Sequence, residues 1–335
     1  IFFMKHDILT IGGATEDFSF YTHEGLLLEG KSDVLHQKMI AFEYGAKIGI
    51  DRVYSTYGGG AANTAVNLSG LGFGVAAVLA VGDDERGRNI INNLKQRKVS
   101  TDLVKVVKGG STGFSFIVIN KNNERIIFSN RGANAQLRLG AKDLVALKKS
   151  KWAYIASLSG PYWLEDLRQI FSVSSVKKIW NPGETQLSGG FKKISQFLKQ
   201  TDIFCVNQDE AMELVLSTGK YQTNDFKFLN NVKNLLTVIK SFGPKMVIIT
   251  SGKNGANFYD GNNFYRQAII KNQKRLDTTG VGDAFHSSFL AGIEMYNGDI
   301  KKAMLLGAYN TAAVISEIGA QNGLLVKSDL KKYKL

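Results

Sequence analysis

The stretch RLDTTGVGDAFHSSF, residues 275–289, places a glycine-rich turn directly before a helical pattern. Such a turn leaves backbone N–H groups free at the positive end of the helix dipole. Gly280 and Gly282 keep side chains away from these groups, and Val281 between them contributes its own N–H, so the turn can bind an anion. Asp283 follows at once. An anion site beside a carboxylate suits phosphoryl transfer, in which the carboxylate orients and deprotonates the attacking hydroxyl.

An ordinary helix start is the alternative for this stretch taken alone, with Asp283 as a first-turn acid. Two better-known phosphate patterns do not fit. The stretch itself contains no G-x-x-x-x-G-K-[ST] sequence, and it lacks the preceding strand and the third glycine of a dinucleotide-binding turn. The sequence therefore excludes these two classes of site as the source of the motif.

The composition indicates a large globular core. Of 335 residues, 44% are hydrophobic, which is enough for one α/β domain or for two domains. The net charge of +13 leaves nucleic acid, anionic membranes and small anionic substrates open as partners. The basic residues come mainly as scattered pairs, which predicts solvated helix faces and disfavours a nucleic-acid partner. These pairs include Lys148-Lys149, Lys177-Lys178, Lys192-Lys193 and Lys301-Lys302.

Cysteine and apolar content limit the compartment and the class of protein. Cys205 is the only cysteine, so no disulfide can form within the chain, and a reducing, cytoplasmic location is expected. The four histidines show no metal-ligand spacing, and no apolar run approaches the ~18 residues of a membrane span. The first residues lack the layout of a secretory signal, and Met4 is the expected natural start.

Short apolar runs alternate with helical patterns along most of the chain. This rhythm predicts an α/β fold, with a doubly wound, mostly parallel sheet and helices on both faces. The expected strands are 7–13, 74–82, 151–158, 176–182, 201–207 and 244–250. The expected helices are 61–71, 84–98, 163–173, 188–200, 208–216, 228–241, 282–296 and 300–316.

Two regions, 14–57 and 109–131, alternate with a period of two instead. The second region reads as a hairpin with its turn at 121–123. We interpret both regions as a small second sheet, a β lid that projects from the core domain. The core domain comprises 4–13, 58–108 and 132–335.

An isolated lid sheet needs something to cover its apolar face. That face can close over a substrate and exclude water, or pack against a second copy in a homodimer, and both can hold together. In a third alternative, these strands only extend the core sheet. The expected apolar face comprises Phe42, Tyr44, Ile48, Ile50, Phe114, Phe116 and Val118.

The motif DTTGVGDAF closely resembles the C-terminal signature of the ribokinase-like (PfkB) carbohydrate kinase family, D-T-T-G-A-G-D. GGGAANTAVNLSGLG, residues 58–72, resembles the N-terminal signature of the same family. The two motifs stand in the family's order and separation, and the resemblance covers nearly the whole chain. It implies a kinase that uses ATP and Mg²⁺, with Asp283 as the catalytic base and Gly280, Val281 and Gly282 as the anion hole.

The resemblance also implies a substrate site. Asp17 matches an aspartate that holds sugar hydroxyls, and Gly58, Gly59 and Asn63 match a second sugar-contacting group. Because three glycines stand in succession, Gly60 is an equal candidate for one of these roles. A turn residue and a helix cap are the ordinary alternatives for Asp17 and Asn63.

For the nucleotide, the resemblance assigns Asn207 and Glu210 to the triphosphate and its hydrated Mg²⁺. Thr250 and Gly252 match the strand end that binds the nucleotide, and Asn310 matches a residue near the adenine. A plain helix start, an ordinary strand exit and a solvent-facing asparagine are the respective alternatives.

A potassium ion is a further implied cofactor. Asp277, Thr279 and Gly319 match the family's site for a monovalent cation. The loop EIGAQNG resembles the G-A-Q of ribokinases but lacks the serine and proline that follow it there. This departure weakens the prediction that potassium activates the protein.

The acceptor is expected to be a sugar, with a nucleoside as the alternative. RGANAQL (131–137) and WNPGE (180–184) resemble ribokinase segments, whereas GGGAAN departs from the ribokinase GGKGAN. A catalytically silent sugar- or nucleotide-binding relative is an alternative of a different class. The complete set of motif residues disfavours it.

Overall fold

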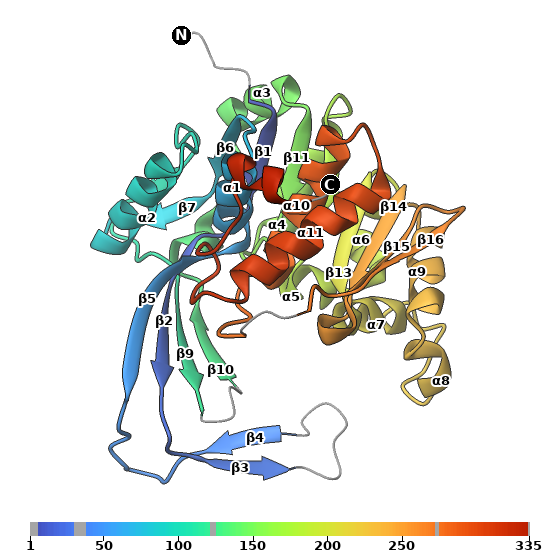
Figure 1. Cartoon of the computed structure of the whole chain (residues 1–335). Coiled ribbons are helices and arrows are strands. Elements are labelled where there is room, and N and C mark those ends of the chain that lie inside the picture. Colours follow the sequence, from blue (N-terminus) through green and yellow to red (C-terminus); the bar gives the residue numbers. More distant parts are fainter. Residues whose placement is uncertain (1–5, 30–37, 121–124, 272–274, 334–335) are drawn as a thin grey trace.

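The computed structural model describes residues 6–29, 38–120, 125–271 and 275–333. These residues form an α/β fold with one large sheet and smaller sheets beside it (Figure 1). The expected start at Met4 and the expected turn at 121–123 lie outside the described residues.

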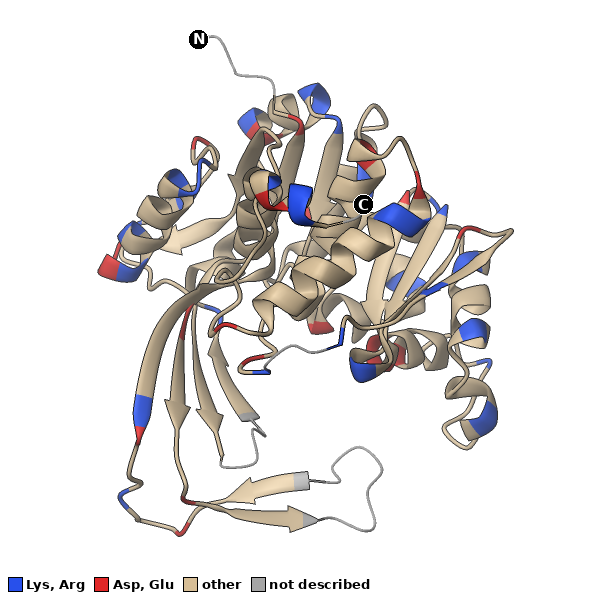
Figure 2. Ribbon diagram, viewed as in Figure 1, with Lys and Arg blue, Asp and Glu red and all other residues tan. Residues whose placement is uncertain are grey.

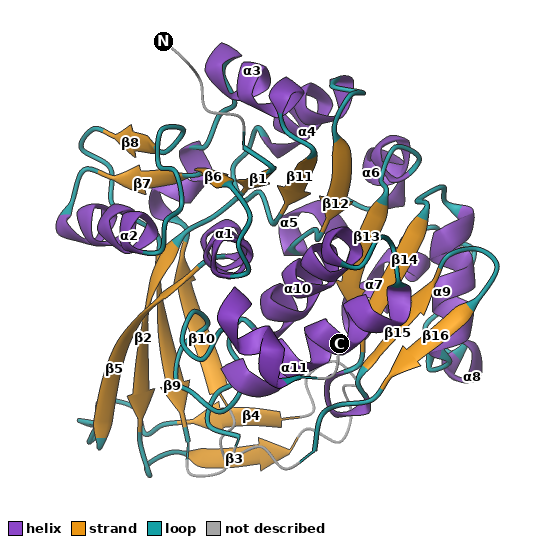
Figure 3. Cartoon of the chain, turned by 45° about the horizontal axis from the view of Figure 1, so that its top comes forward, coloured by secondary structure: helices purple, strands orange, loops and turns teal. Residues whose placement is uncertain are grey.

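One large sheet forms the centre of the fold (Figure 3). Its eight strands lie in the order β16 (Phe264–Gln267), β15 (Ala256–Tyr259), β14 (Met246–Thr250), β13 (Ile203–Asn207), β12 (Lys177–Trp180), β11 (Trp152–Ile155), β1 (Ile8–Ile11) and β6 (Val75–Val78). From β14 to β6 all neighbours run parallel, and β15 and β16 add an antiparallel edge. Parallel strands buried on both faces are almost continuously apolar, so the sequence pattern identified them but missed the antiparallel edge.

Helices cover both faces of this sheet, which confirms the predicted doubly wound fold (Figure 3). Alternate strand residues point to opposite faces, so Ile11 joins one core and Ile8 the other. The first core packs under α3 (Ala141–Lys149), α4 (Trp163–Ser172), α5 (Glu184–Leu187), α6 (Phe191–Leu198), α7 (Gln208–Leu216), α8 (Phe226–Leu229) and α9 (Val232–Ser241). The second core packs under α1 (Gly60–Gly70), α2 (Glu85–Gln96), α10 (Val281–Met295) and α11 (Ile300–Val314).

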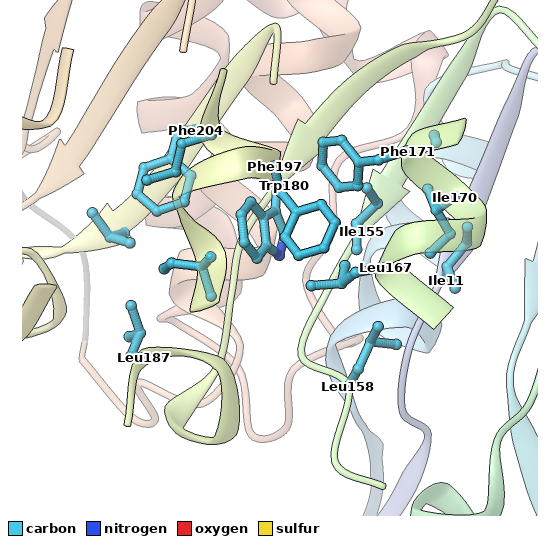
Figure 4. Close-up of a cluster of buried hydrophobic side chains, with 14 of the residues drawn as sticks. Ile11, Ile155, Leu158, Leu167, Ile170, Phe171, Trp180, Leu187, Phe197 and Phe204 are labelled. Atoms are coloured by element: carbon cyan, nitrogen blue, oxygen red, sulfur yellow. The ribbon is translucent and has the colours of Figure 1, made fainter. Parts of the chain in front are cut away.

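Aromatic rings fill the centre of the first core (Figure 4). The Trp180 ring on β12 packs edge-on against Phe197 of α6 and Phe204 of β13. All three side chains are buried, so this contact attaches α6 firmly to the sheet.

The prediction of a single strand at 74–82 was wrong. The Leu79 carbonyl accepts the N–H of Lys105 at 2.9 Å, which directs the chain away from β6. The residues that follow form β7 (Ala80–Gly82), which pairs with β8 (Lys105–Val107) in a separate two-stranded sheet. Helix α3 had no counterpart among the expected helices.

The segments of period-two alternation form a second sheet, here called the projecting sheet (Figure 1). Its strands are, in spatial order, β10 (Arg125–Asn130), β9 (Phe114–Ile119), β2 (Thr15–Tyr21) and β5 (Arg52–Gly58). The strands β9 and β10 are antiparallel, as their sequence predicted, and β2 lies between β9 and β5. A further hairpin joins β3 (Leu26–Glu29) and β4 (Lys38–Ala41). None of these strands extends the main sheet.

The two faces of the projecting sheet differ in chemistry. Asp17 is the register partner of Ser115 and Thr56, so these three residues share one face. The opposite face is aromatic, with Phe116 of β9 in ring contact with Phe18, Phe20 and Phe114. Asp17 and the aromatic cluster therefore lie on opposite sides of the sheet.

The expected apolar face is correct only in part. Phe114, Phe116 and Val118 alternate along β9 and share the aromatic face. The other four expected members lie between β4 and β5, outside any strand: Phe42, Tyr44, Ile48 and Ile50. Their alternating sequence arises in a loop and not in a strand.

Lysine and arginine residues are spread over many elements (Figure 2). Three of the lysine pairs lie exposed on helices, but Lys177-Lys178 lies in β12 and contradicts that expectation. Lys178 is buried, and its ammonium group donates hydrogen bonds to the carbonyls of Val173 and Val176. Burial lowers the pKa of this lysine. Among the described residues, no helix has the length and apolar content needed to cross a membrane.

Candidate active site

Two glycines, Gly280 and Gly282, lie at the start of α10, and their surroundings differ. Gly280 has a left-handed backbone with φ of 71°, and a Cβ on it would lie 2.3 Å from the Cβ of Ala320. Packing and backbone shape therefore require glycine at this position. Gly282 has neither constraint, since a Cβ on it would meet only the ring of His286 at 3.9 Å. The described part of the chain leaves this space open.

The first N–H groups of α10 are available to a ligand. The N–H of Ala284 is the first to bond within the helix, to the carbonyl of Gly280 at 2.9 Å. Among the described residues, the N–H groups of Gly280, Val281 and Gly282 have no hydrogen-bond acceptor. Unpaired N–H groups at a helix start favour the binding of an anion.

A cavity of about 340 Å³, here called the α10 cavity, opens beside this helix start. Val281, Gly282 and Phe285 form one wall. Thr250, the last residue of β14, and Gly252 in the turn after it were expected to bind the nucleotide, and both also line the cavity. The rest of the lining comes from Gly255, Ala256, Gln267, Ala268, Ile269, Ile270, Lys271, Arg275, Ala308, Thr311, Ala312 and Ile315. The apolar majority suits a flat base, and the two cations suit phosphates.

Asn310 is not part of the α10 cavity. Its side chain is fully buried and donates hydrogen bonds to Asn67 Oδ1 (2.6 Å) and Ser288 Oγ (2.7 Å). Its own oxygen accepts the N–H of Leu325 at 2.9 Å. This geometry does not match the expected contact with adenine, because the amide is used to tie α11 to α1 and α10. Its neighbour Thr311 lines the cavity instead.

Asp283 lies where the two sequence motifs meet. Asn63 of α1 donates a hydrogen bond of 2.9 Å from Nδ2 to Asp283 Oδ2, across 220 residues of sequence. The other carboxylate oxygen, Oδ1, faces Gly60, at 3.6 Å from the position that a Cβ would take there. Burial raises the pKa of Asp283, and the hydrogen bond from Asn63 opposes that rise.

Two glycines of the first motif leave room for Asp17 and Ala14. A Cβ on Gly58 would lie 2.0 Å from Asp17 Oδ2, and a Cβ on Gly59 would lie 2.5 Å from Ala14 Cα. Gly59 also has a positive φ of 90°. The chain can therefore pass between Asp17 and Ala14 only without side chains at these two positions.

Asp17 is a buried carboxylate with spare hydrogen-bonding capacity. It is 5% exposed, and its Oδ1 has no partner among the described residues. Burial raises its pKa, and hydrogen bonds from the hydroxyls of Ser115 and Thr15 lower it in part. A buried acceptor without a donor is costly, so a ligand hydroxyl would be bound favourably here.

Asn207 and Glu210 begin α7. The Asn207 oxygen accepts the N–H of Glu210 at 2.9 Å, and Glu210 Oε2 accepts the N–H of Asn207 at 2.8 Å. Burial, with smaller effects from Glu213, Asp283 and Asp209, raises the pKa of Glu210 to about 7. A single carboxylate beside an amide oxygen suits a Mg²⁺ ion that keeps most of its own waters.

The three residues expected to hold potassium do come together. Asp277 Oδ1 accepts the N–H (2.8 Å) and the hydroxyl (2.7 Å) of Thr279, and its Oδ2 accepts the N–H of Gly319 at 3.0 Å. Among the described residues, no group of three or more His, Cys, Asp or Glu side chains is placed to hold a metal ion. Potassium binding stays a prediction.

Sequence reasoning missed Lys271, Arg275 and Gln321. Lys271 and Arg275 line the α10 cavity, and their positions just before the DTTG motif were the available signal. Gln321 donates a hydrogen bond of 3.0 Å to Asn63 Oδ1. Its place in the GAQ segment drew attention only to the potassium site.

The family model of the pfkB family carbohydrate kinases matches residues 35–327 of this chain. The chain belongs to the pfkB family of carbohydrate kinases. As a pfkB-family member, it is an ATP-dependent phosphotransferase with an alcohol group as acceptor.

Relatives of this pfkB-family kinase differ in their acceptors. An uncharacterized sugar kinase of Archaeoglobus fulgidus is 28% identical over 265 residues, covering 77% of this chain and 98% of its own. A ribokinase of Mus musculus is 26% identical and covers 82% of this chain and 83% of its own. The solved structure of a nucleoside kinase from Methanocaldococcus jannaschii has a TM-score of 0.76 at 20% identity, with 98% of each chain covered.

The two glycines of α10 provide a matched pair of variants. Gly282→Ala is expected to melt like the parent and to lose at least tenfold in kcat, because its Cβ would enter the open space where we expect a phosphate to bind. Gly280→Ala is expected to lose about 1–3 kcal/mol of stability through strain and its clash with Ala320. Thermal melting and steady-state kinetics measure both effects. Parent-like turnover in Gly282→Ala would contradict an anion site here.

The raised pKa of Glu210 predicts a pH-dependent stability. The folded protein holds the Glu210 proton more tightly than the unfolded chain, so stability falls as pH rises from the ordinary 4.5 to about 7. Because Glu210→Gln stays neutral, its melting temperature minus that of the parent is expected to increase across that pH range in the absence of metal. Glu85→Gln, at the exposed start of α2, is the control. A constant difference between Glu210→Gln and parent would contradict the assignment.

Proposed function

We propose that this pfkB-family kinase transfers the γ-phosphoryl group of ATP to a hydroxyl of a sugar. The observation that supports this most strongly is the place of Asp283. It follows the open N–H groups of α10 directly and contacts Asn63 of the other motif. In this proposal the phosphate binds on one side of the carboxylate and the hydroxylated acceptor on the other.

The α10 cavity is proposed to bind ATP. Apolar residues such as Ile269, Ile270 and Ile315 enclose the base, and Lys271 and Arg275 attract the phosphates. The N–H groups of Gly280, Val281 and Gly282 then stabilise the charge on the transferred phosphoryl group.

The acceptor is proposed to bind against Asp17. A sugar hydroxyl donates to Asp17 Oδ1, the buried oxygen that has no protein donor. Asp283 accepts the proton of the attacking hydroxyl as the oxygen bonds to the γ-phosphorus and the bond to ADP breaks. The aspartate is left protonated, and ADP leaves with the displaced electron pair.

Mg²⁺ is proposed to be held through Asn207 and Glu210. The cation neutralises charge on the triphosphate when it is bound. Its approach would also lower the pKa of Glu210 by offsetting the repulsion from Asp283 and Asp209. Potassium near Asp277, Thr279 and Gly319 is a secondary proposal.

A nucleoside is the second candidate acceptor. A buried carboxylate recognises neighbouring hydroxyls, which both a free sugar and the ribose of a nucleoside provide. The names of the relatives include both kinds of kinase, and the identities of 20–28% favour neither.

The single buried thiol, Cys205, supports a cytoplasmic location.

A panel of sugars and nucleosides with ATP and Mg²⁺ tests this proposal. Phosphorus NMR is expected to show a phosphate monoester and ADP with at least one sugar. Asp283→Asn is expected to lower that turnover by roughly 10²-fold or more with ATP affinity near normal, because the variant cannot accept the proton. A nucleoside ester alone would select the second candidate. Parent-like turnover in Asp283→Asn would remove the base assignment, and ATP binding without any ester would indicate a non-catalytic relative.

We also propose that the projecting sheet acts as a lid and as a dimer surface, with 14–57 and 109–131 forming a unit distinct from the core. The Asp17 face borders the site, because Gly319 packs against Thr56 of β5. The aromatic face points away and leaves Phe116 and Phe128 40% and 59% exposed. Covering such a face by a second copy would remove apolar area from water.

Light scattering at micromolar concentration tests the dimer. The parent is expected at twice the monomer mass, and Phe116→Asp is expected to be monomeric because it charges the aromatic face. Val106→Asp on β8 is the control, since it charges an exposed apolar residue of another sheet. A monomeric parent would rule out the dimer. Scattering that does not change on adding the acceptor would count against lid closure.

A further inference from the structure

Three side-chain amides form a chain that ends on Asp283. Asn93 of α2 donates to Gln321 Oε1 at 2.8 Å, and Gln321 Nε2 donates to Asn63 Oδ1 at 3.0 Å. Asn63 Nδ2 then donates to Asp283 Oδ2 at 2.9 Å. Gln321 and Asn63 are 4% and 5% exposed, so water does not compete freely for these bonds.

The direction of this chain follows from the carboxylate. An ionised carboxylate only accepts, so Asn63 must turn its NH₂ group toward Asp283 and its oxygen away. Gln321 meets that oxygen with its own NH₂ group. If Gln321 were absent, Asn63 could rotate its oxygen toward the carboxylate, and that hydrogen bond would be lost.

Gln321 is itself held by the loop that supports the anion site. Its neighbour Ala320 packs against Gly280, where a Cβ would approach to 2.3 Å. The preceding Gly319 donates its N–H to Asp277 Oδ2 at 3.0 Å. Gly319 and Ala320 therefore contact the turn before α10, and the next residue, Gln321, contacts Asn63.

We propose that Gln321 is a positioning residue for the reaction. It holds Asn63 in the orientation that donates to Asp283 Oδ2 and so leaves Oδ1 as the atom that accepts the proton. Oδ1 faces Gly60, whose missing side chain leaves room for the acceptor hydroxyl. This inference rests on the proposed function of Asp283 and adds the group that orients it.

The other groups near Asp283 do not belong to this chain. Glu210 of α7 and Tyr154 of β11 sense the charge of Asp283, and His286 lies one turn along α10. Glu210 accepts the N–H of Asn207, and the polar atoms of the Tyr154 and His286 side chains have no hydrogen-bond partner among the described residues. A change in the ionisation of Asp283 after substitution of Gln321 would therefore come through Asn63.

Gln321→Ala tests the proposal through the pH dependence of kcat. The donation from Asn63 favours the ionised carboxylate, so its loss raises the pKa of Asp283. The acid limb of kcat is expected to move to higher pH, and kcat to fall about 10- to 100-fold with little change in KM for ATP. Gln321→Glu, of the same size, is expected to move the limb further, because its carboxylate draws the NH₂ group of Asn63 away from Asp283.

Two controls separate positioning from support of the loop. Asn322→Ala removes a bond to the Ile318 carbonyl in the same loop but does not touch Asn63, and its acid limb is expected to stay in place. Asn63→Ala combined with Gln321→Ala is expected to lose no more kcat than Asn63→Ala alone. A fall in kcat without a shift of the limb, or additive losses in the double variant, would overturn the proposal.

A readout without turnover separates this proposal from the proposed function. Folding raises the pKa of Asp283, so the contribution of Asp283 to the free energy of unfolding falls as the pH rises. Thermal melts of Gln321→Ala are compared with melts of the double variant Gln321→Ala/Asp283→Asn. The fall in melting temperature that depends on Asp283 is expected to extend to higher pH than in the parent. If that displacement appears while Asp283→Asn turns over like the parent, only the base assignment fails. If it is absent while Asp283→Asn is inactive, only the role of Gln321 fails.

Discussion

Helix α1 packs against α10 through a buried row of hydrogen bonds, and the proposed chemistry depends on this contact. Asn63 reaches Asp283, and one turn further along, Asn67 donates to Ser287 and Ser288. Each bond joins the N-terminal motif to the C-terminal one. Buried amides and hydroxyls need specific partners, so they set the register of the two helices as an apolar contact would not.

This contact explains why glycines gather at both helix starts. Gly58 and Gly59 let the chain pass beside Asp17 and Ala14 on its way into α1, and Gly280 lets α10 begin against Ala320. Gly282 differs, because among the described residues only the ring of His286 comes near the position of its absent Cβ, at 3.9 Å. The same residue type therefore serves packing at three positions and leaves open space at the fourth, where we propose that the phosphate binds.

Much of this arrangement could be predicted from the sequence. The parallel strands and their helices follow from apolar periodicity, and the motifs placed Asp283 at the start of a helix beside free N–H groups. Side-chain pairing could not be predicted. Asn310 was expected at the nucleotide because nothing local shows that Asn67 and Ser288 use its amide. Gln321 escaped for the same reason, since its partner lies 258 residues away. Loop 42–51 alternates like a strand, yet it forms no strand in the structure.

The most direct test of the account is a crystal structure with a non-hydrolysable ATP analogue, Mg²⁺ and the acceptor found in the panel. The account predicts that the N–H groups of Gly280, Val281 and Gly282 bind the terminal phosphate. It also predicts that the acceptor hydroxyl lies within about 3 Å of Asp283 Oδ1. A terminal phosphate bound away from α10, or an acceptor hydroxyl directed at another group, would contradict the central claim.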